Sequence, residues 1–228
     1  MKLSVVMPVY NEKYTILKVI DRVLKEDSVY EIIAVDDGST DGTKDLLLGG
    51  GLDRRVKVLT HDKNMGKGAA LRTGFAAASG DVTLVQDADC EYDPAEYNNL
   101  LGPILKGEAD AVYGSRLSGG RPQRAYMFWH KLGNNAITLF ANVLYNTTLS
   151  DIETGYKLIK TPLLKEIAIK SNGFGIEPEI TAKLLKKRAR VYEVPISYYG
   201  RTYAEGKKIF WYHGVEALWA LLKYRFVD

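Results

Sequence analysis

The sequence predicts an α/β fold in which helices flank a mostly parallel, Rossmann-like sheet. Short apolar runs rich in β-branched residues alternate with amphipathic stretches through residues 1–110. This alternation is typical of parallel strands joined by right-handed crossovers. Three of the apolar runs end in loops of acids, hydroxyls and glycines. A last amphipathic stretch, 209–224, predicts a carboxyl-terminal helix that closes the chain.

The apolar runs are the expected strands, and the expected helices lie between them. Strands are expected at 2–9, 31–36, 55–59, 82–85, 110–113, 157–159 and 191–197. Pro8 ends the first run, and we expect Asn11 to cap the helix after it, because its side chain can accept hydrogen bonds from the first turn. Further helices are expected from Thr43, at 69–78, at 94–105, at 128–144, from Pro162, at 174–188 and at 209–224.

Four acids follow the apolar run at 82–85, namely Asp87, Asp89, Glu91 and Asp93. Carboxylates crowded at the end of a buried strand repel one another and lose solvation, which disfavours their charged form. A divalent cation removes that cost, and hard cations prefer oxygen ligands. The alternative interpretation is an acidic surface loop. Because ligands of open parallel sheets bind outside the carboxyl ends of the strands, we favour a metal and nucleotide site.

Composition limits the class of protein. With 228 residues, 46% of them hydrophobic, we expect a single globular domain over 1–228. A net charge of +3 gives no support for nucleic-acid binding, and the single cysteine, Cys90, excludes an intramolecular disulfide. The chain begins in a strand, with no signal peptide, and His213 and Glu216 interrupt its last long apolar stretch. We therefore expect a cytoplasmic protein, either soluble or peripheral at a membrane face.

The loops at the ends of these strands resemble those of the family 2 glycosyltransferases. The chain has no P-loop spacing around Lys67 and no Gly-x-Gly-x-x-Gly after the first strand, which argues against two other nucleotide sites. The motifs that carry the resemblance are residues 6–12, 35–41 and 86–89. Later motifs are similar to the branch of polyprenyl-phosphate (dolichyl-phosphate) mannosyl- and glucosyltransferases: residues 64–68, 114–116, 154–157 and 201–208. The resemblance covers about residues 3–208.

The resemblance implies a GT-A type fold, a nucleoside-diphosphate sugar donor, a Mg or Mn ion and inversion at the anomeric carbon. Residues 1–115 would bind the donor, and residues 116–228 would bind the acceptor and carry the last helix. The implied donor-binding residues are Pro8, Tyr10, Glu12, Asp37, Lys67, Asp87, Arg201, Lys207 and Lys208. Asp89 would ligate the ion, with Asp87 and Glu91 as further ligands, although Glu91 stands where relatives often have glutamine.

The acceptor is left open by the residues themselves. The resemblance implies that Arg116, with Arg121 or Arg124, would hold an acceptor phosphate. A lipid phosphate is already an anion, so it needs no general base, and guanidinium groups grip phosphate oxygens bidentately. A hydroxyl acceptor needs a carboxylate to take its proton. Glu153 is then the candidate, because the turn at 151–155 falls where many hydroxyl-directed relatives keep their base.

The expected function is transfer of a hexose from a GDP-mannose or UDP-glucose type donor to a polyprenyl phosphate. The enzyme would meet its lipid through a membrane surface or a membrane partner protein, and the basic and aromatic carboxyl end suits such a surface. One rival is the same fold acting on a sugar hydroxyl. A nucleotidyltransferase is disfavoured because no glycine-rich basic loop follows the first strand. A catalytically silent adaptor is disfavoured by the presence of Asp37, Asp89 and Arg201.

Overall fold

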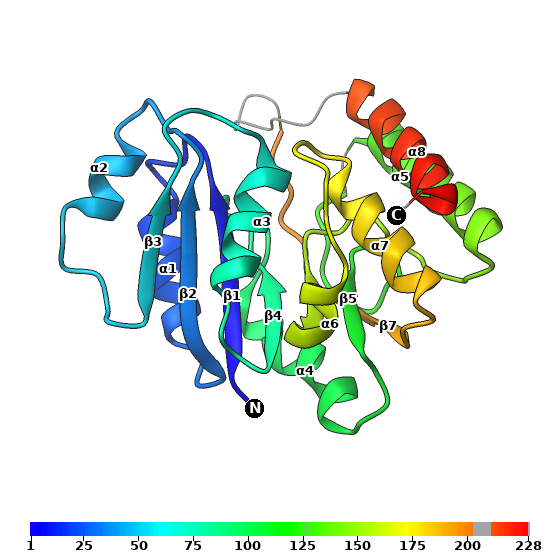
Figure 1. The fold of residues 1–228 in the computed structure, drawn as a ribbon, viewed down its shortest axis with the longest axis horizontal. Coiled ribbons are helices and arrows are strands. Elements are labelled where there is room, and N and C mark those ends of the chain that lie inside the picture. The colour runs from blue at the N-terminus through cyan, green and yellow to red at the C-terminus, as the bar shows by residue number, and fades with distance from the viewer. Residues whose placement is uncertain (126, 203–210, 228) are drawn as a thin grey trace.

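The computed structural model describes residues 1–125, 127–202 and 211–227. Within them, one sheet of seven strands has the order β3-β2-β1-β4-β6-β5-β7 (Figure 1). The strands are β1 (Leu3–Val9), β2 (Val29–Asp36), β3 (Val56–Thr60), β4 (Val82–Val85), β5 (Ala111–Ser115), β6 (Lys157–Lys160) and β7 (Val191–Pro195). The predicted α/β fold, with a mostly parallel sheet flanked by helices and a carboxyl-terminal helix, is confirmed.

Strands β1 to β4 form a parallel block whose carboxyl ends meet at one edge. The last residue of β1, Val9, lies opposite Asp36, the last residue of β2, and Val6 lies opposite Val85 at the end of β4. From β1 the chain crosses outward to β2 and β3, and then returns to place β4 on the other side of β1. The strand order therefore reverses between β1 and β4, which is where open α/β sheets bind their ligands.

The strand β6 runs antiparallel to both of its neighbours, β4 and β5. A strand that runs in the opposite direction brings its amino end to the edge where the neighbouring strands have their carboxyl ends. The loop at 151–156, which precedes β6, therefore lies at the same edge as the acids that follow β4. Alternation of apolar runs along the sequence did not predict this reversal.

Helices cover both faces of the sheet, so the central strands β1 and β4 are buried on both faces. Alternate residues of β1, such as Val5 and Met7, pack towards α1 (Ile16–Leu24) and α4 (Tyr97–Leu105). Val6 and the opposite face pack towards α3, α6 and α7, which lie in front of the sheet in Figure 1. These helices span Lys67–Ala77, Thr161–Glu166 and Ile176–Lys186. Burial on both faces explains why the strands appear in the sequence as continuous apolar runs.

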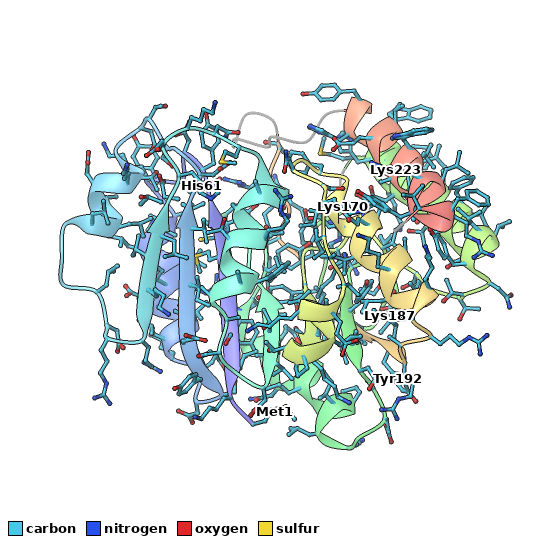
Figure 2. All side chains as sticks on the ribbon, in the orientation of Figure 1. Met1, His61, Lys170, Lys187, Tyr192 and Lys223 are labelled. Carbon is cyan, nitrogen blue, oxygen red and sulfur yellow. The ribbon has the colours of Figure 1, made fainter. Side chains whose placement is uncertain are left out.

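Two long helices, α5 (Phe128–Tyr145) and α8 (Trp211–Phe226), pack together beside α7. They lie at the end of the molecule away from α2 (Thr43–Leu48), as Figure 1 shows. The Tyr145 hydroxyl donates to the Leu221 carbonyl at 2.7 Å and joins the two helices. Side chains project from them into solvent, among them that of Lys223 (Figure 2). Of the helices within the described residues, none has the length and apolar character needed to span a membrane.

One helix cap differs from the prediction. Helix α1 begins at Ile16, and its N-cap residue is Thr15. Asn11 lies before the helix and has a φ of 52°. The Asn11 Oδ1 instead accepts a hydrogen bond from the Thr40 N–H at 2.8 Å, and its own N–H donates to Ser39 Oγ at 3.0 Å. The prediction of an Asn11 cap is therefore wrong, because the side chain joins the loops after β1 and β2.

Helix α3 approaches the sheet closely at Gly74, and this contact predicts the effect of a substitution there. A Cβ at Gly74 would collide with the Val6 side chain and lie 3.4 Å from Val35 Cγ2. We expect Gly74→Ala to lower the free energy of unfolding by about 1–3 kcal/mol, because overpacking forces a close-packed core apart. Chemical denaturation measures the change. The control is Gly133→Ala in α5, where a Cβ would meet nothing within 4 Å, and an equal loss in both variants would contradict the argument.

Candidate active site

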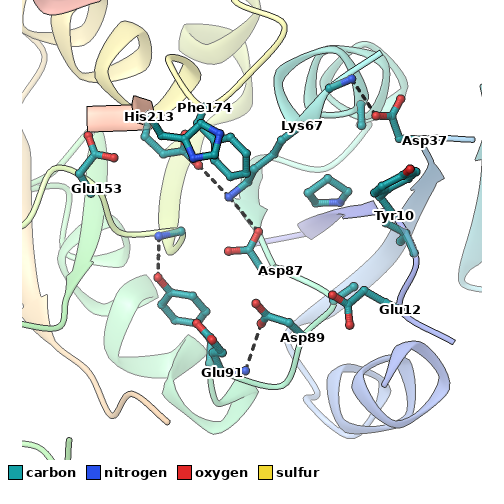
Figure 3. A pocket seen from close by; sticks show the side chains of 18 of the residues that line it. Tyr10, Glu12, Asp37, Lys67, Asp87, Asp89, Glu91, Glu153, Phe174 and His213 are labelled. Carbon is teal, nitrogen blue, oxygen red and sulfur yellow. Dashed lines mark hydrogen bonds and ion pairs between the residues drawn. The ribbon is translucent and has the colours of Figure 1, made fainter. Parts of the chain in front are cut away.

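A cavity of about 430 Å³ opens at the carboxyl edge of the sheet. In Figure 3 one side of it carries Tyr10, Glu12 and Asp37, and Asp87 and Asp89 lie in the middle. The predicted site residues that line it are Pro8, Tyr10, Glu12, Asp37, Lys67, Asp87, Asp89, Glu91, Arg116, Glu153 and Arg201. Arg121 and Arg124 are exposed and do not line it. Lys207 and Lys208 fall outside the described residues.

At the centre of the cavity several carboxylates lie close together around the side chain of Arg201. The Arg201 guanidinium Nη2 lies 3.2 Å from both Glu12 Oε1 and Asp89 Oδ2, and its backbone N–H donates to Glu91 Oε1 at 2.8 Å. Burial, with repulsion from Asp87 and Glu91, raises the pKa of the Asp89 carboxyl to about 7 despite Arg201. One guanidinium therefore does not fully compensate the negative charge gathered here.

Oxygen ligands for a divalent cation are present among these carboxylates, but they are engaged with cationic side chains. The described residues contain no group of three or more histidines, cysteines or acids already arranged to hold a metal ion. Glu91 accepts hydrogen bonds from the Tyr198 hydroxyl at 2.5 Å and from Arg201, so it also connects the loop after β4 to the segment after β7. The donor set of Asp87 and Asp89 fits a hard cation, because buried carboxylates with uncompensated charge gain most from one.

Lys67 stands at the start of α3 and bridges two acids from different elements. Its ammonium nitrogen Nζ lies 3.0 Å from Asp87 Oδ1 (Figure 3). The same nitrogen lies 2.7 Å from Glu177 Oε1. The charges of both acids raise the pKa of Lys67 well above its usual value, against the effect of burial. Lys67 is therefore a fixed positive charge beside the acidic motif, and it ties the loop after β4 to the first turn of α7.

Asp37 is almost fully buried and holds the loop after β3 in place. Its carboxylate accepts hydrogen bonds from the backbone N–H groups of Met65 at 3.0 Å and Gly66 at 2.8 Å. His61 Nδ1 lies 2.6 Å from Asp37 Oδ1, and His61 Nε2 lies 2.9 Å from Thr73 Oγ1. Asp37 thus shapes the wall of the cavity as well as lining it. No pattern in the sequence predicted that His61 would pair with Asp37.

The predicted acceptor residue Arg116 is buried against a partner that sequence reasoning did not name. Its Nε and Nη2 donate to the two Asp151 carboxylate oxygens at 2.7 and 2.8 Å, and Asp151 also accepts its backbone N–H. The guanidinium packs over the Tyr198 ring at 5.1 Å from its centroid. This bidentate pair fixes the direction of Arg116, whose remaining N–H groups at Nη1 have no partner among the described residues.

The loop at 151–156 is held from several sides and carries Glu153 into the cavity. The buried Lys157 Nζ donates to the carbonyls of Ile152 and Thr154 at 2.8 and 2.5 Å, and the Gly155 N–H donates to the Tyr92 hydroxyl oxygen at 2.8 Å. A Cβ at Gly155 would run into the Asp87 carboxylate, so glycine lets the two loops touch. Burial and repulsion from Glu177 raise the pKa of Glu153 to about 8.

Glu177 lines the cavity, and sequence reasoning did not separate it from Glu179. Glu177 and Glu179 both lie in the first turn of α7, where acids favour the helix dipole. The structure separates them, because Glu179 accepts hydrogen bonds from the backbone of Lys170 and Ser171 and pairs with Lys183. Glu177 instead faces Lys67 and the cavity. Nothing in the sequence distinguishes these two glutamates, which are two residues apart on one turn.

Comparisons with known proteins agree on one family. Glycosyl transferase family 2 matches residues 4–168. The chain is 31% identical over 203 residues to the low-salt glycan biosynthesis hexosyltransferase Agl6 of Haloferax volcanii, a match that covers 87% of this chain and 48% of that protein. It is 30% identical over 220 residues to the dolichol-phosphate mannosyltransferase of Pyrococcus furiosus, covering 93% and 62%. The chain thus spans about half to two thirds of the length of these two relatives.

A shorter relative and a solved structure complete the comparison. The undecaprenyl-phosphate mannosyltransferase of Micrococcus luteus is 29% identical over 214 residues, which cover 91% of this chain and 87% of that protein. The crystal structure of glucosyl-3-phosphoglycerate synthase from Mycobacterium tuberculosis, in complex with Mn2+, UDP and glucosyl-3-phosphoglycerate, has a TM-score of 0.76. It is 24% identical, and the match covers 100% of this chain and 81% of that one. This likeness supports the GT-A type fold.

The raised pKa of Glu153 predicts how stability depends on pH. The folded protein keeps this proton up to about pH 8, whereas a free glutamate releases it near 4.5. The unfolded state therefore binds fewer protons between these values, so this group's contribution to the unfolding free energy falls as pH rises. We expect wild type to lose about 1 kcal/mol or more relative to Glu153→Gln between about pH 5 and 7.5.

Chemical denaturation at a series of pH values measures this difference. The control is Glu166→Gln on α6, whose side chain is 62% exposed, and its stability should follow that of wild type across the series. Parallel curves for wild type and Glu153→Gln would show that Glu153 releases its proton at an ordinary pH.

Proposed function

The chain belongs to glycosyl transferase family 2, and from that premise we propose that it is an inverting, metal-dependent hexosyltransferase. The donor is a nucleoside-diphosphate sugar of the GDP-mannose or UDP-glucose type, and the acceptor is a polyprenyl phosphate. The relatives named dolichol-phosphate and undecaprenyl-phosphate mannosyltransferase support this acceptor class.

The observation that carries the proposal is the row of groups along the cavity. Tyr10, Glu12 and Asp37 form the wall that would border the nucleoside. Asp87 and Asp89 lie next to it, with the cationic groups of Lys67 and Arg201 against them. A nucleoside diphosphate needs acceptors for its base and ribose and positive charge for its phosphates, and this row offers both in that order. Lys207 and Lys208 remain proposed partners of the diphosphate.

Asp87 and Asp89, with Glu91 as a further ligand, would hold a Mg or Mn ion. Such an ion, when bound, stabilises the negative charge that develops on a departing diphosphate. The side chain of Arg201 would then exchange its contact with Asp89 for one with the donor phosphates. Glu91 would keep Tyr198 and the Arg201 backbone in place, as it does in this structure.

A phosphate acceptor has to be bound through its phosphate group, and it needs no general base because it is already an anion. Arg116, aimed by Asp151, would direct its outer N–H groups to the phosphate, and Arg124 or Arg121 would assist from the loop before α5. A phosphate oxygen attacks C1 of the hexose on the face opposite the diphosphate. The bond from C1 to the diphosphate oxygen breaks, and the nucleoside diphosphate leaves with the electron pair.

The rival acceptor is a sugar hydroxyl, with Glu153 as the base. A carboxyl that keeps its proton up to about pH 8 is poorly suited to take another at neutral pH, which favours the phosphate acceptor. An acceptor screen separates the two, with a short polyprenyl phosphate compared against free and lipid-linked sugars.

The exposed apolar surface of α5 and α8 would meet the membrane that holds the lipid acceptor. Trp129, Trp219 and Phe226 are 76%, 63% and 78% exposed there. The exposed basic residues Lys223 and Arg225 lie at the end of α8. Aromatic side chains suit the headgroup region, and basic ones are drawn to anionic lipids. The first turn of α8 also lines the cavity through Tyr212 and His213, so a lipid phosphate at this surface is close to the site.

The role of Asp89 supplies the main test of the proposed function. We expect Asp89→Asn to reduce hexose transfer by at least about a thousandfold in the presence of Mn2+, because electrostatic stabilisation of the leaving group is lost. Radiolabelled transfer to a short polyprenyl phosphate measures the loss, and thermal unfolding checks the fold. Asp93→Asn is the matched control, because Asp93 follows in the same loop but serves as a helix cap. Turnover retained by Asp89→Asn would refute the assignment.

A vesicle assay tests the membrane surface. We expect the double substitution Trp219→Ser and Phe226→Ser to weaken binding to vesicles containing phosphatidylglycerol by roughly tenfold, because two large apolar side chains no longer enter the interface. Co-sedimentation measures the binding. The matched control replaces Leu48 and Leu105, which are 57% and 61% exposed on other helices, with serine. If the control loses as much affinity as the test variant, or neither loses any, the α5 and α8 surface is not the contact.

A further inference from the structure

The cavity extends beyond the acidic motif to a pair of glutamates that the nucleoside and diphosphate do not use. Glu177 comes from the first turn of α7, and Glu153 comes from the loop before β6. Both line the cavity. In Figure 3, Glu153 lies on the side opposite Tyr10 and Asp37, with Asp87 between them. These elements belong to different parts of the chain, so their meeting here is a property of the fold.

Each of the two carboxyl groups has an oxygen that is buried without a hydrogen-bond partner in the part of the chain that the structure describes. Glu177 is only 6% exposed, and its Oε1 pairs with Lys67, whereas its Oε2 is buried without a hydrogen bond among the described residues. Glu153 Oε1 is buried and unpartnered in the same way. Buried polar atoms in native proteins are almost always hydrogen-bonded, so two such oxygens in one cavity indicate a ligand that donates to them. The helix dipole accounts for the charge of Glu177 but gives its second oxygen no donor.

The chemistry of this end of the cavity selects a neutral ligand rich in hydroxyl groups. The Glu177 carboxylate repels a phosphate, and the Glu153 carboxyl, which keeps its proton up to about pH 8, offers a phosphate no positive charge. Neither the diphosphate nor the acceptor headgroup is therefore suited to this end. A carboxylate accepts strong hydrogen bonds from hydroxyl groups, and its two oxygens can accept them from two neighbouring hydroxyls. The rings of Phe174 and His213, whose centroids are 4.3 Å apart, also line the cavity. They provide flat faces against which the carbon skeleton of a sugar ring can pack.

The order of groups along the cavity indicates that this ligand is the hexose of the donor. Lys67 Nζ lies 3.0 Å from Asp87 Oδ1 and 2.7 Å from Glu177 Oε1. The Lys67 ammonium group thus lies between Asp87, which is proposed to hold the metal ion at the diphosphate, and the glutamate pair. In a nucleoside-diphosphate sugar the hexose follows directly after the second phosphate, on the side away from the nucleoside. The glutamate pair occupies that place relative to the nucleoside wall.

We propose that Glu177 and Glu153 form the subsite for the transferred hexose, accepting hydrogen bonds from its hydroxyl groups and so determining which sugar the enzyme uses. This inference rests on the proposed function, because it assumes a nucleotide-sugar donor bound across Asp87. Lys67 is the positioning residue of the subsite, since it holds one oxygen of Glu177 and leaves the other to the sugar. Hydrogen bonds from Lys157 and to Tyr92 hold the loop around Glu153, and so keep the second carboxyl group in place.

The test is a double-mutant cycle that combines the removal of one donor hydroxyl with the substitution of one glutamate. GDP-mannose and UDP-glucose are assayed with Mn2+ and a short polyprenyl phosphate, and the donor that supports transfer is compared with analogues that each lack one hydroxyl of the sugar. In wild type, we expect at least one analogue to lose about tenfold or more in kcat/KM, the usual effect of removing a hydrogen bond to a charged group. In Glu177→Gln, which removes a charged acceptor, or Glu153→Ala, which removes the acceptor altogether, the same analogue should lose less than about twofold relative to the full sugar.

Glu193→Gln is the matched control for a purely structural effect. Glu193 accepts hydrogen bonds from the backbone N–H groups of Ser150 and Asp151, behind the loop, and does not line the cavity. Its substitution should lower transfer from every donor by the same factor, so that each analogue keeps its wild-type penalty. Calorimetry with the matching nucleoside diphosphate should give affinities within about twofold of wild type for both test variants, because that ligand lacks the sugar.

The outcomes separate the two proposals. If wild type transfers sugar and both glutamate variants retain every wild-type penalty, the hexose subsite is wrong and the proposed function stands. If the variants lose affinity for the nucleoside diphosphate as much as for the donor, the glutamates act on the diphosphate and the subsite is again wrong. If wild type transfers from neither donor nor binds either diphosphate, the proposed function fails, and the subsite fails with it.

Discussion

The structure depends on the cost of crowding carboxylates at the edge of a buried parallel sheet. Glu12, Asp87, Asp89 and Glu91 come together where the strand order reverses, and burial, with repulsion from Asp87 and Glu91, raises the pKa of Asp89. Lys67 on one side and Arg201 on the other offset much of that charge. Both cations come from other elements, the start of α3 and the segment after β7. Neutralising the acids therefore also fixes the loops that surround the cavity.

The second constraint is the reversed direction of β6, which brings the loop at 151–156 to the edge where the parallel strands end. The loop at 151–156 is held by Lys157 from beneath and by the Asp151 pair with Arg116 from the side. Because Gly155 has no side chain, the loop can touch Asp87. The result is one continuous cavity in which the proposed phosphate grip, the acids and the glutamate pair share walls. A proposed membrane surface on α5 and α8 adjoins this cavity through the first turn of α8.

Much of the fold follows from local pattern, and the reasons are visible in particular elements. The strands that became β1, β2 and β4 are apolar on both faces, so they stand out in the sequence, and their parallel pairing follows from the alternation with helices. Asn11 shows where local pattern fails. Its residue type suits a helix cap, but tertiary contact with Thr40 gives its side chain a different partner. The antiparallel direction of β6 likewise could not be predicted from local pattern, because strand direction depends on pairing between distant segments.

For the site, the sequence by itself determined the residue types and the edge of the sheet where they would gather. Tyr10, Asp37, Asp87 and Asp89 follow strands whose carboxyl ends meet at one edge, so their convergence needed no coordinates. Only the tertiary structure decided the partners. It joined Arg116 to Asp151 and separated Glu177 from Glu179. It also set Lys67 between Asp87 and Glu177, which lie 20 and 110 residues further along the chain, beyond the reach of any local rule. The physical reason is that charge pairing in a cavity depends on which side chains meet in space, and helix or strand periodicity carries information only about neighbours along the chain.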